Sequence, residues 1–536
     1  MERPLRLDRR AFVKLGVTAL ASLRAGGALW ADPPGEFTPS FTTDNARWQE
    51  AYDQALRVLA GNVRLLPQYD KPVLIEGSVY SGIWLECGPL ESLVYRKFRP
   101  DIARNSHRAF FSLQRPDGQL PASIKTSETG YGQIQMVVPI AATAWELARA
   151  TGDEQLLASA YDSCSRWDDW LMRYRSTRGT GLIEGFCAYD TGHDNSPRWA
   201  GIPNRCPDRD ARKMPAIASL PRLCPDLSAT AYGGRLALSS MASALGKASE
   251  AIQWAEKAAH LRQVILSTLY NQADAAFYDL DAQGRFMSVR GDVLTRVCGE
   301  HIPDRRLFDE LWSRQIHAAK AFWPAYPLPS VALDDPLFVR PIPRNSWGGA
   351  SQALTALRAG RWLDHYGRSA DFGGMMSHWC EAIQRDGGFR QQLDPLTGVF
   401  TQADAPTYSP CALVMVDYTW RLAGVREEAG GLHWNVRPGH PAAKAALFRL
   451  RTDNGQAAVL RYQPEGALLS LGNVEVARIP SGSVRLVTDE RGSPLRLVGI
   501  DERPQTVAIA FAGHKPRSLR VEPNQVIEIP PLADAG

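Results

Sequence analysis

Hydrophobic residues recur at helical spacing over most of the first 424 residues of the chain. Ten segments carry apolar side chains at intervals of three and four positions, which gathers them on one face of a helix. Several of these segments end in Gly or Asp-Gly, as helices commonly do. The segments are residues 47–63, 102–114, 137–153, 154–175, 230–246, 248–270, 307–316, 349–367, 374–386 and 410–425. We expect about ten to twelve helices, tending to form consecutive pairs.

The pattern changes after about residue 425, where apolar and polar residues alternate. Over residues 445–500 the alternating runs are separated by turn sequences such as Asp-Asn-Gly and Pro-Glu-Gly. Residues 506–511, 519–523 and 526–530 continue the alternation. This pattern predicts an antiparallel β domain, resembling a sandwich, that packs against the helices and carries no catalytic group.

The paired helical segments show no sequence repeat at a fixed period, which argues against a solenoid. The connecting loops are long and rich in Trp, Tyr, Asn, Gln and Asp. A closed ring of helical hairpins with such loops gathered at one end is typical of a sugar-binding cleft. We therefore expect a mostly α catalytic domain over residues 32–424 and the β domain over residues 425–536.

The first 31 residues differ in character from the rest. Arg9 and Arg10 precede Phe12, and a short, weakly apolar run of small residues follows to Ala31. This order resembles a twin-arginine signal, so we expect the twin-arginine export machinery to use residues 1–31 and to deliver a periplasmic or secreted protein. The run is too short to span a membrane, and no later segment reaches the required length.

The net positive charge belongs to this N-terminal segment. Six of the 61 Lys and Arg residues and two of the 57 Asp and Glu residues lie within residues 1–31, which leaves 55 of each sign. The remaining chain has no basic excess to attract nucleic acid or an anionic membrane surface.

The eight cysteines and ten histidines form no metal-binding motif, since Cys-x-x-Cys, His-x-His and His-Glu-x-x-His are all absent. A Gly-rich phosphate loop and a Gly-x-Ser-x-Gly elbow are absent as well. We expect no metal and no cofactor. Cys206 and Cys224 flank a loop rich in Pro and Arg and could pair after export, whereas the other cysteines are expected to be buried thiols.

Residues 188–199, with the sequence AYDTGHDNSPRW, hold two carboxylates among residues that favour irregular backbone. A helix is expected to begin near Asp226, which places Asp194 on a loop. The string TGHDNSPRW resembles the general-acid segment of family 63 glycoside hydrolases, especially the short bacterial mannosylglycerate-hydrolase-like members. It is more distantly similar to family 37 trehalases. Weaker matches in the family order extend over about residues 75–424.

The resemblance implies an (α/α)6 barrel and cleavage of an α-glycosidic bond with inversion, with Asp194 as the proton donor. Such an enzyme needs one protonated carboxyl and a second, ionised carboxylate that activates water. Desolvation by Trp199 and Tyr189, or the charge of Asp190, can keep Asp194 protonated. Arg198 is expected to bind a sugar hydroxyl or to hold Asp190. In the alternative interpretation, Asp194 only makes a turn and caps the next helix.

The resemblance fails at the catalytic base, where the family carries Glu and this chain carries Gln391. A neutral amide cannot take a proton from water at a useful rate. Three explanations remain open: another carboxylate is the base, phosphate is the attacking group as in inverting phosphorylases, or the protein binds sugar without cleaving it. We favour another carboxylate, first Asp394, then Glu86, with Asp404 as a further candidate. Asp394 can equally be a turn residue and Glu86 a charge at a helix start.

Other loop residues are expected to contact a carbohydrate substrate. Aromatic faces stack on the C–H surface of a pyranose, and amides supply the few placed hydrogen bonds that a polyol needs. The expected substrate-binding residues are Trp84, Gln133, Gln135, Asp190, Asn195, Arg198, Trp199, Asn345, Trp347, Gln391, Gln392 and Tyr408.

Overall fold

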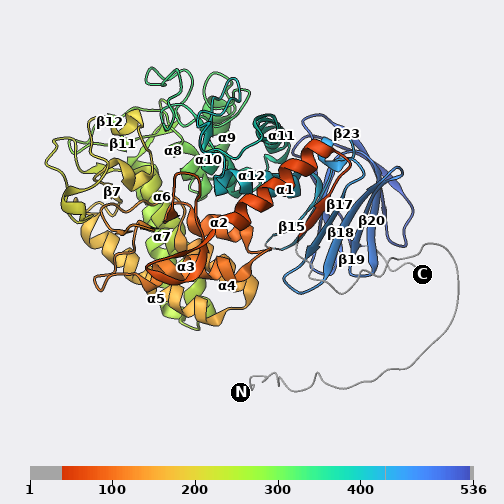
Figure 1. Cartoon of the computed structure of the whole chain (residues 1–536), viewed down its shortest axis with the longest axis horizontal. Coiled ribbons are helices and arrows are strands. Elements are labelled where there is room, and N and C mark those ends of the chain that lie inside the picture. The colour runs from red at the N-terminus through yellow and green to blue at the C-terminus, as the bar shows by residue number, and fades with distance from the viewer. Residues whose placement is uncertain (1–38, 429, 532–536) are drawn as a thin grey trace. The chain divides into compact units, whose positions relative to one another are not determined.

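The computed structural model describes residues 39–428 and 430–531 (Figure 1). The expected export signal at residues 1–31 lies outside these residues. Twelve α-helices occur in the described part of the chain, and ten of them coincide with the predicted segments. They are α1 (Ala46–Gly61), α2 (Gly88–Tyr95), α3 (Pro100–Ser112), α4 (Ile140–Thr151), α5 (Glu154–Tyr174), α6 (Pro225–Ala244), α7 (Ala248–Thr268), α8 (Val293–Gly299), α9 (Arg305–Leu311), α10 (Ala353–Leu363), α11 (Ser369–Asp386) and α12 (Ser409–Ala423).

Helices α2 and α8 escaped the sequence prediction because they are short and buried on most sides. Six of the eight residues of α2 and six of the seven residues of α8 are buried. A helix with no exposed face has no polar stripe, so the period of 3.6 residues is not visible in its sequence.

The even-numbered helices contact one another in a closed order. Helix α2 contacts α4, α4 contacts α6, α6 contacts α8, α8 contacts α10, α10 contacts α12, and α12 contacts α2. Helices α1, α3, α5, α7 and α11 pack against members of this set. All 15 residues of α12 are buried, as expected of a helix that is surrounded by others.

Short antiparallel sheets join the long loops between the helices. One sheet contains β4 (Gly82–Trp84), β5 (Ser123–Lys125) and β6 (Thr129–Gly130). A second contains β7 (Glu184–Gly185), β8 (Arg222–Leu223), β11 (Asp279–Leu280) and β12 (Phe286–Met287), and a third pairs β13 (Ser351–Gln352) with β14 (Gln392–Leu393). Two further hairpins pair β2 (Val63–Leu66) with β3 (Tyr69–Leu74) and β9 (Tyr270–Asn271) with β10 (Ala276–Phe277). The first three of these sheets join loops that are separated in sequence.

The prediction of antiparallel strands after about residue 425 is confirmed. A seven-stranded sheet has the order β1 (Ser40–Thr42), β17 (Leu447–Arg451), β18 (Ala457–Gln463), β19 (Gly466–Leu471), β20 (Val474–Ser481), β23 (Gln505–Phe511) and β24 (Arg517–Val521). A five-stranded sheet has the order β15 (Val425–Glu428), β16 (Gly431–Val436), β21 (Val484–Thr488), β22 (Pro494–Val498) and β25 (Val526–Glu528). Strand β1 precedes all the helices and pairs with β17, so a division at residue 425 does not separate every strand from them.

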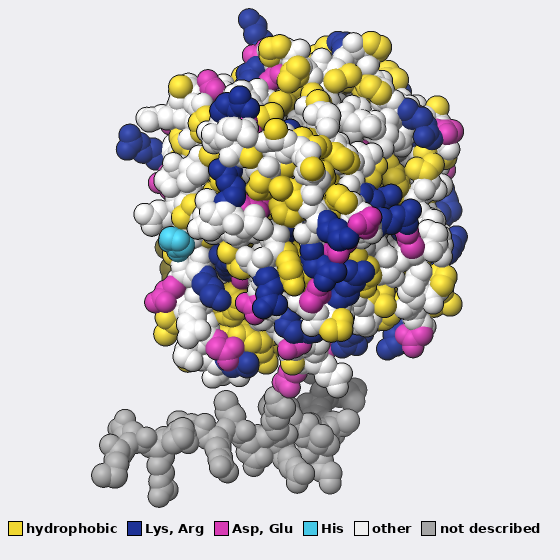
Figure 2. Space-filling view, turned by 90° about the vertical axis from the view of Figure 1, so that its left-hand side faces the viewer, with side chains coloured by type: hydrophobic (Ala, Val, Ile, Leu, Met, Phe, Trp, Pro, Cys, Tyr) yellow, Lys and Arg dark blue, Asp and Glu magenta, His cyan; other side chains and the backbone are white. Residues whose placement is uncertain are grey.

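The five-stranded sheet packs against the helical part through α12, which contacts both β15 and β16. Within the described residues, every helix is too short or too polar to cross a membrane. On the face shown in Figure 2, Lys and Arg side chains have Asp and Glu side chains among them, in keeping with the balance of charges in the sequence.

All eight cysteines are free and buried. Cys206 and Cys224 do not form the disulfide that the sequence suggested. The sulfur of Cys206 lies close to that of Cys187, whereas the sulfur of Cys224 lies near the carboxylates of Asp226 and Asp279.

Candidate active site

Asp194 lies on an irregular loop, as the sequence predicted, between two short 3₁₀ helices. These are η1 (Ala188–Thr191) and η2 (Pro197–Trp199). Gly192 and Asn195 adopt left-handed backbone conformations, with φ of +63° and +55°. Glycine and asparagine tolerate this conformation best, so the sequence around Asp194 suits a chain that changes direction on both sides of it.

The carboxyl group of Asp194 has an environment suited to holding a proton. Nδ2 of Asn345 lies 3.4 Å from Oδ2 of Asp194. Burial raises the pKa of Asp194 to about 6, while the contact with Asn345 and the positive charge of Arg205 act in the opposite direction. The backbone carbonyl of Asp194 accepts a hydrogen bond from the Trp347 N–H at 2.9 Å, which holds the residue in place. A carboxyl with this pKa is partly protonated near neutral pH, as a general acid must be.

Gln391, at the position of the expected base, is linked to Asp194 through one other side chain. The hydroxyl of Tyr80 donates to Oε1 of Gln391 at 2.7 Å, and Nε2 of Gln402 donates to the same oxygen at 2.8 Å. Nε2 of Gln391 donates to Oδ1 of Asn345 at 3.3 Å. The structure therefore brings Gln391 and Asn345 together beside Asp194. Tyr80 and Gln402 were not predicted, because isolated polar residues in loops carry no spacing signal.

Glu86 is the carboxyl that the structure places against the Asp194 loop. Its side chain is buried, and Nε2 of Gln135 donates to its Oε1 at 3.1 Å. Gln133 in turn donates to Oε1 of Gln135 at 3.0 Å, so both predicted glutamines help to orient Glu86. Burial and the charge of Asp194 together raise the pKa of Glu86 to about 7, against the opposing effect of Arg296.

Gly192 allows this close approach. A Cβ atom added to Gly192 would lie 1.7 Å from Oε2 of Glu86 and 2.9 Å from its Cδ. Any side chain at position 192 would therefore displace Glu86, in addition to straining a backbone with positive φ. The glycine two residues before Asp194 leaves room for the Glu86 carboxyl against the loop.

Aromatic and acidic groups surround the same part of the site. The ring of Tyr80 lies 5.6 Å from the ring of Trp84 and 5.9 Å from that of Tyr408. The hydroxyl of Tyr408 donates to Oε1 of the buried Glu76 at 2.7 Å, so its polar atom is already used inside the protein. Burial raises the pKa of Glu76 well above its usual value and that of Glu91 to about 8. These carboxyls lie in surroundings that disfavour negative charge.

Arg198 and Trp199 have structural roles, which corrects two predictions. Arg198 is buried and donates to both oxygens of Asp226 at 2.7 Å and to those of Asp279 at 2.6 and 2.8 Å. It therefore cannot also serve a sugar hydroxyl, and it does not hold the loop carboxylate that we expected. Trp199 is buried, and its Nε1 donates to the hydroxyl of Thr191 at 2.8 Å. Its ring offers no free face for stacking on a sugar.

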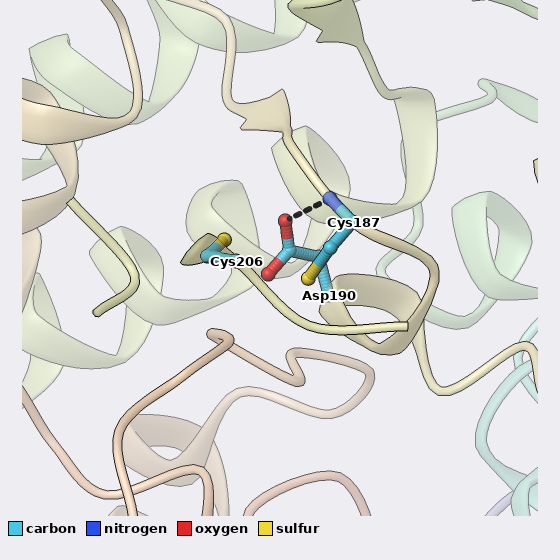
Figure 3. Close-up of side chains that lie close together, drawn as sticks. All are labelled: Cys187, Asp190 and Cys206. Atoms are coloured by element: carbon cyan, nitrogen blue, oxygen red, sulfur yellow. Dashed lines mark hydrogen bonds between the residues drawn. The ribbon is translucent and has the colours of Figure 1, made fainter. Parts of the chain in front are cut away.

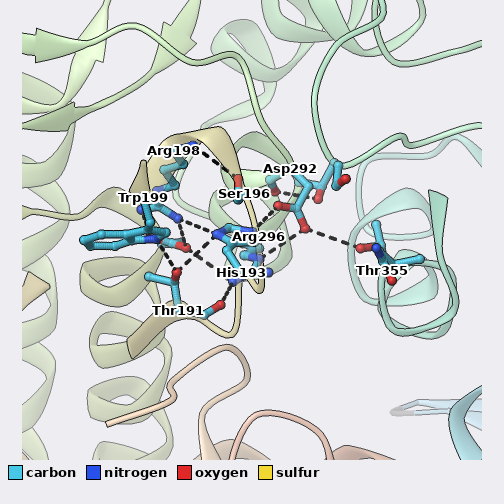
Figure 4. Close-up of polar contacts among 12 residues, drawn as sticks. Thr191, His193, Ser196, Arg198, Trp199, Asp292, Arg296 and Thr355 are labelled. Atoms are coloured by element: carbon cyan, nitrogen blue, oxygen red, sulfur yellow. Dashed lines mark hydrogen bonds and ion pairs between the residues drawn. The ribbon is translucent and has the colours of Figure 1, made fainter. Parts of the chain in front are cut away.

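His193, directly before Asp194, anchors the loop as a neutral side chain. Nη1 of Arg198 can only donate, and it lies 2.9 Å from Nδ1 of His193. Nδ1 therefore accepts, and Nε2–H donates to Oδ1 of Asp292 at 2.5 Å (Figure 4). Burial lowers the pKa of His193 to about 4. Burial alone would raise the pKa of Asp292, but Arg296 and His193 hold it far below its usual value.

Asp190 is also structural, although we expected it to contact substrate and to influence Asp194. The carboxylate of Asp190 is fully buried and forms a bidentate pair with Arg175 at 2.6 and 3.2 Å. It also accepts hydrogen bonds from the backbone N–H groups of Ile134 and Cys187. These bonds tie the start of the loop to two other segments. Burial of Asp194, rather than the charge of Asp190, raises the pKa of the candidate acid.

Asp394, the first candidate for the base, holds a turn. Its Oδ1 accepts from the backbone N–H groups of Leu396 and Thr397 at 2.8 and 3.1 Å, and its Oδ2 lies 3.3 Å from Nη2 of Arg340. This is the turn residue that the sequence analysis named as the alternative. Asp404 is exposed and pairs with an arginine on the surface. Of the three candidate bases, only Glu86 is placed next to the Asp194 loop.

The remaining predicted sugar contacts differ in how available they are. Gln392 is fully buried, and its Oε1 accepts a backbone N–H at 3.0 Å, so it cannot contact a substrate in this conformation. Trp347 is 2% exposed and its ring lies 5.2 Å from that of His193, which makes it part of the loop support. Asn195 is exposed and donates through Nδ2 to the backbone carbonyl of Asn345 at 2.9 Å.

Comparison with known families gives a match over most of the chain. Residues 84–451 match the model of the mannosylglycerate hydrolase MGH1-like glycoside hydrolase domain. A comparison with curated protein sequences finds no match.

Several solved structures share the fold. The GH63 mannosylglycerate hydrolase from Thermus thermophilus in complex with Tris is 18% identical, with a TM-score of 0.57 over 69% of this chain and 100% of that chain. A further structure of that enzyme holds Tris and D-glycerate, with 17% identity and a TM-score of 0.56 over 68% of this chain and 100% of that one. The GH78 family rhamnosidase of Bacillus sp. GL1 is 13% identical, with a TM-score of 0.56 over 82% of this chain and 42% of that chain.

Proposed function

The chain belongs to the mannosylglycerate hydrolase MGH1-like glycoside hydrolases, and from this membership we propose that it hydrolyses an α-linked glucoside or mannoside with inversion. The closed order of contacts among α2, α4, α6, α8, α10 and α12 supports an (α/α)6 barrel as its framework. The observation that carries the proposal is the pair of carboxyls formed by Asp194 and Glu86, both with raised pKa values.

Asp194 is the general acid in this proposal. It protonates the glycosidic oxygen as the bond to the leaving group breaks. Its pKa of about 6 keeps a useful fraction protonated near neutral pH, and Asn345 beside Oδ2 orients the group. The backbone bond to Trp347 and the buried anchor of His193 fix its position, so little reorganisation is needed when substrate binds.

Glu86 takes the part of the base that Gln391 cannot fill. The negative charge of Asp194 raises the pKa of Glu86, so the first proton taken up near neutral pH is shared between the two carboxyls. Taken alone, the higher pKa of Glu86 would place that proton on Glu86. We assign it to Asp194 because the Asp194 segment resembles the general-acid segment of the family, and because Arg296 and Gln135 stabilise negative charge on Glu86.

A basic hollow that is connected to Glu86 through the hydrogen bonds of Gln133 and Gln135 suits a charged aglycone. A cavity of about 250 Å³ is lined by Gln133 together with Arg115, Lys125, Arg205 and Arg209. The four cations outnumber the two acidic residues in the lining, Glu128 and Asp208. The positive charge of this lining would attract an aglycone with a carboxylate, such as the D-glycerate bound by the Thermus enzyme.

The neutral side chain of Gln391 supports a second candidate, a protein that binds sugar without hydrolysing it. Oε1 of Gln391 accepts hydrogen bonds from Tyr80 and Gln402, and Nε2 donates one to Asn345, so its amide oxygen is fully used in this structure. In such a protein the Asp194–Glu86 pair would have no reaction to serve. An inverting phosphorylase, which needs no base, is the other outcome that Gln391 allows.

The test is a hydrolysis screen with α- and β-linked disaccharides, glycosylglycerates and aryl glycosides, in which proton NMR follows the first anomer released. The proposal expects cleavage of an α-linked substrate, with the β-anomer appearing first and no requirement for phosphate. Retention of configuration would overturn the inverting mechanism. Glycosyl phosphate formation would select the phosphorylase, and binding without turnover across the panel would select the binding protein.

We also propose that residues 1–31 direct export through the twin-arginine pathway, on the strength of Arg9 and Arg10 and the run that follows them. Replacing both arginines with lysine should leave an uncleaved precursor inside the cell, whereas the unchanged chain should be recovered in the periplasm. Export of the Lys-Lys variant at the normal level would contradict this assignment.

A further inference from the structure

Two cysteine thiols lie together at the two ends of the segment that carries Asp194. The sulfur atoms of Cys187 and Cys206 and a carboxylate oxygen of Asp190 all lie within 4.8 Å of one another (Figure 3). Cys187 directly precedes η1, and the segment from Cys187 to Cys206 has 20 residues. Backbone hydrogen bonds from Ala188 to Pro203 and from Tyr189 to Asn204 hold the two ends side by side.

A metal ion fits this cluster poorly. Both oxygens of Asp190 are already used by the guanidinium of Arg175 and by backbone N–H groups. Nη2 of Arg175 also lies 3.5 Å from the sulfur of Cys206, so a cation at this point would face a buried positive charge at close range. Burial raises the pKa of the Cys187 thiol well above its usual value, which disfavours the thiolate that a metal needs.

We propose that Cys187 and Cys206 form a disulfide that closes the Asp194 loop under oxidising conditions. The sulfurs need only a short movement, because they already lie within 4.8 Å of each other and the two backbone hydrogen bonds just inside the pair hold the chain ends together. Cys206 is a buried residue in an otherwise exposed stretch, residues 203–209, so a local opening of that stretch gives an oxidant access to it. The proposal concerns a covalent modification and does not depend on the proposed glycoside hydrolase activity.

The step balances with a small disulfide such as oxidised glutathione as the oxidant. Cys206, whose sulfur lies 3.5 Å from Nη2 of Arg175, attacks glutathione disulfide once the stretch has opened, forms a mixed disulfide and releases the first glutathione. The second cysteine then displaces the second glutathione and forms the protein disulfide. The two electrons and the two thiol protons leave with the two molecules of reduced glutathione.

The test uses the full chain, treated with oxidised or with reduced glutathione, alkylated, digested without reduction and examined by mass spectrometry. The expected product is a linked peptide pair containing Cys187 and Cys206, lighter by two hydrogen atoms than the sum of the two peptides. Cys224→Ser is the matched control, which should keep the link, while Cys206→Ser should abolish it. Because a disulfide reduces the conformational entropy of the unfolded chain, the oxidised form should melt about 2–4 °C higher than the reduced form.

Several results would overturn the proposal. They are a Cys206–Cys224 link, glutathione adducts on unlinked Cys187 and Cys206, or two free thiols after oxidation. Stoichiometric zinc binding that protects both thiols from alkylation would also overturn it, in favour of a metal site. The wild-type measurement decides these outcomes even if a serine variant fails to fold.

Discussion

The carboxylates around the Asp194 loop fall into two groups with opposite titration behaviour. Asp226 and Asp292, on the buried side, have pKa values held low, to about 2 for Asp226, because arginine side chains outweigh the effect of burial. Asp194 and Glu86 are raised, to about 6 and about 7. Burial acts in the same direction in all four. The placement of guanidinium groups therefore decides which carboxylates are permanent anions and which can hold a proton.

The difference shows how one loop serves both structure and chemistry. Its buried side chains are fixed by charge pairs, while the carboxyl of Asp194 has, among the described residues, a single hydrogen-bonding partner, the amide of Asn345. Arg296 links the two groups, since its Nε lies 3.2 Å from Asp292 and its charge also lowers the pKa of Glu86. The buried ion pairs of Asp226 and Asp292 thus hold the loop in place, while Asp194 and Glu86 remain free to exchange a proton.

The largest effect is expected at Asp194, where a substitution should change activity and leave stability almost unchanged. Asp194→Asn should lower kcat for an unactivated glycoside by about 10²–10⁴-fold, since the proton donor is lost, with little change in Tm. Steady-state hydrolysis and thermal unfolding measure both quantities. Asp190→Asn, the same substitution four positions earlier, is the matched control and should lower Tm instead, because it leaves Arg175 without its buried partner. Full activity of Asp194→Asn would contradict the division of these carboxylates into permanent anions and proton carriers.

The next largest effect is expected on stability, from the buried ion pairs of Asp292. Asp292→Asn leaves the cation of Arg358 without its buried carboxylate and leaves Arg296 with only its longer contact to Asp226, at 3.4 Å. The substitution should reduce the free energy of unfolding by about 3–5 kcal/mol. Urea denaturation followed by tryptophan fluorescence measures this change. Wild-type stability in the variant would show that the buried pairs do not hold the loop.

Glu86→Gln should make the protein more stable while it abolishes turnover. Because the folded pKa is raised from 4.5 to about 7, Glu86 weakens folding as pH rises through that range. The full difference corresponds to about 3 kcal/mol above pH 7. The variant should therefore gain about this much over the wild type at pH 8 and little at pH 4, as measured by denaturant unfolding at both pH values. An equal gain at the two pH values would show that the charge of Glu86 is not the cause.

The smallest effect concerns Gln391. Gln391→Glu adds a negative charge two hydrogen bonds away from Asp194 and should raise its pKa by about 1 unit. The alkaline limb of the profile of kcat/KM against pH, which reports loss of the proton donor, should move up accordingly. A rise in kcat of about 10-fold or more would instead identify position 391 as the vacant site of the base and would remove Glu86 from that role.

The sequence was informative where a pattern repeats and silent where contacts join distant residues. Amphipathic helices such as α3 and α10 were visible, whereas α2 and α8 lacked an exposed face. The string around Asp194 located the candidate acid. Arg198 was misassigned because its partners Asp226 and Asp279 lie 28 and 81 positions further along the chain.

The choice among bases shows the same limit. Asp394 was preferred for its place in the sequence beside Gln391, but its oxygens serve the local turn. Glu86 lies far from residue 194 in sequence, and only the fold brings it against Gly192. Tyr80, which bonds to Gln391 across 311 positions, carried no sequence signal at all.

The most direct test of the assigned proton is the dependence of rate on the leaving group. A dinitrophenolate departs without protonation, whereas an alcohol leaving group needs the acid. Asp194→Asn should therefore stay within about 10-fold of the wild type on a dinitrophenyl glycoside while losing at least about 10²-fold on the corresponding methyl glycoside, and Glu86→Gln should lose activity on both. Equal losses for Asp194→Asn on the two substrates, with the selective loss found in Glu86→Gln instead, would contradict the account.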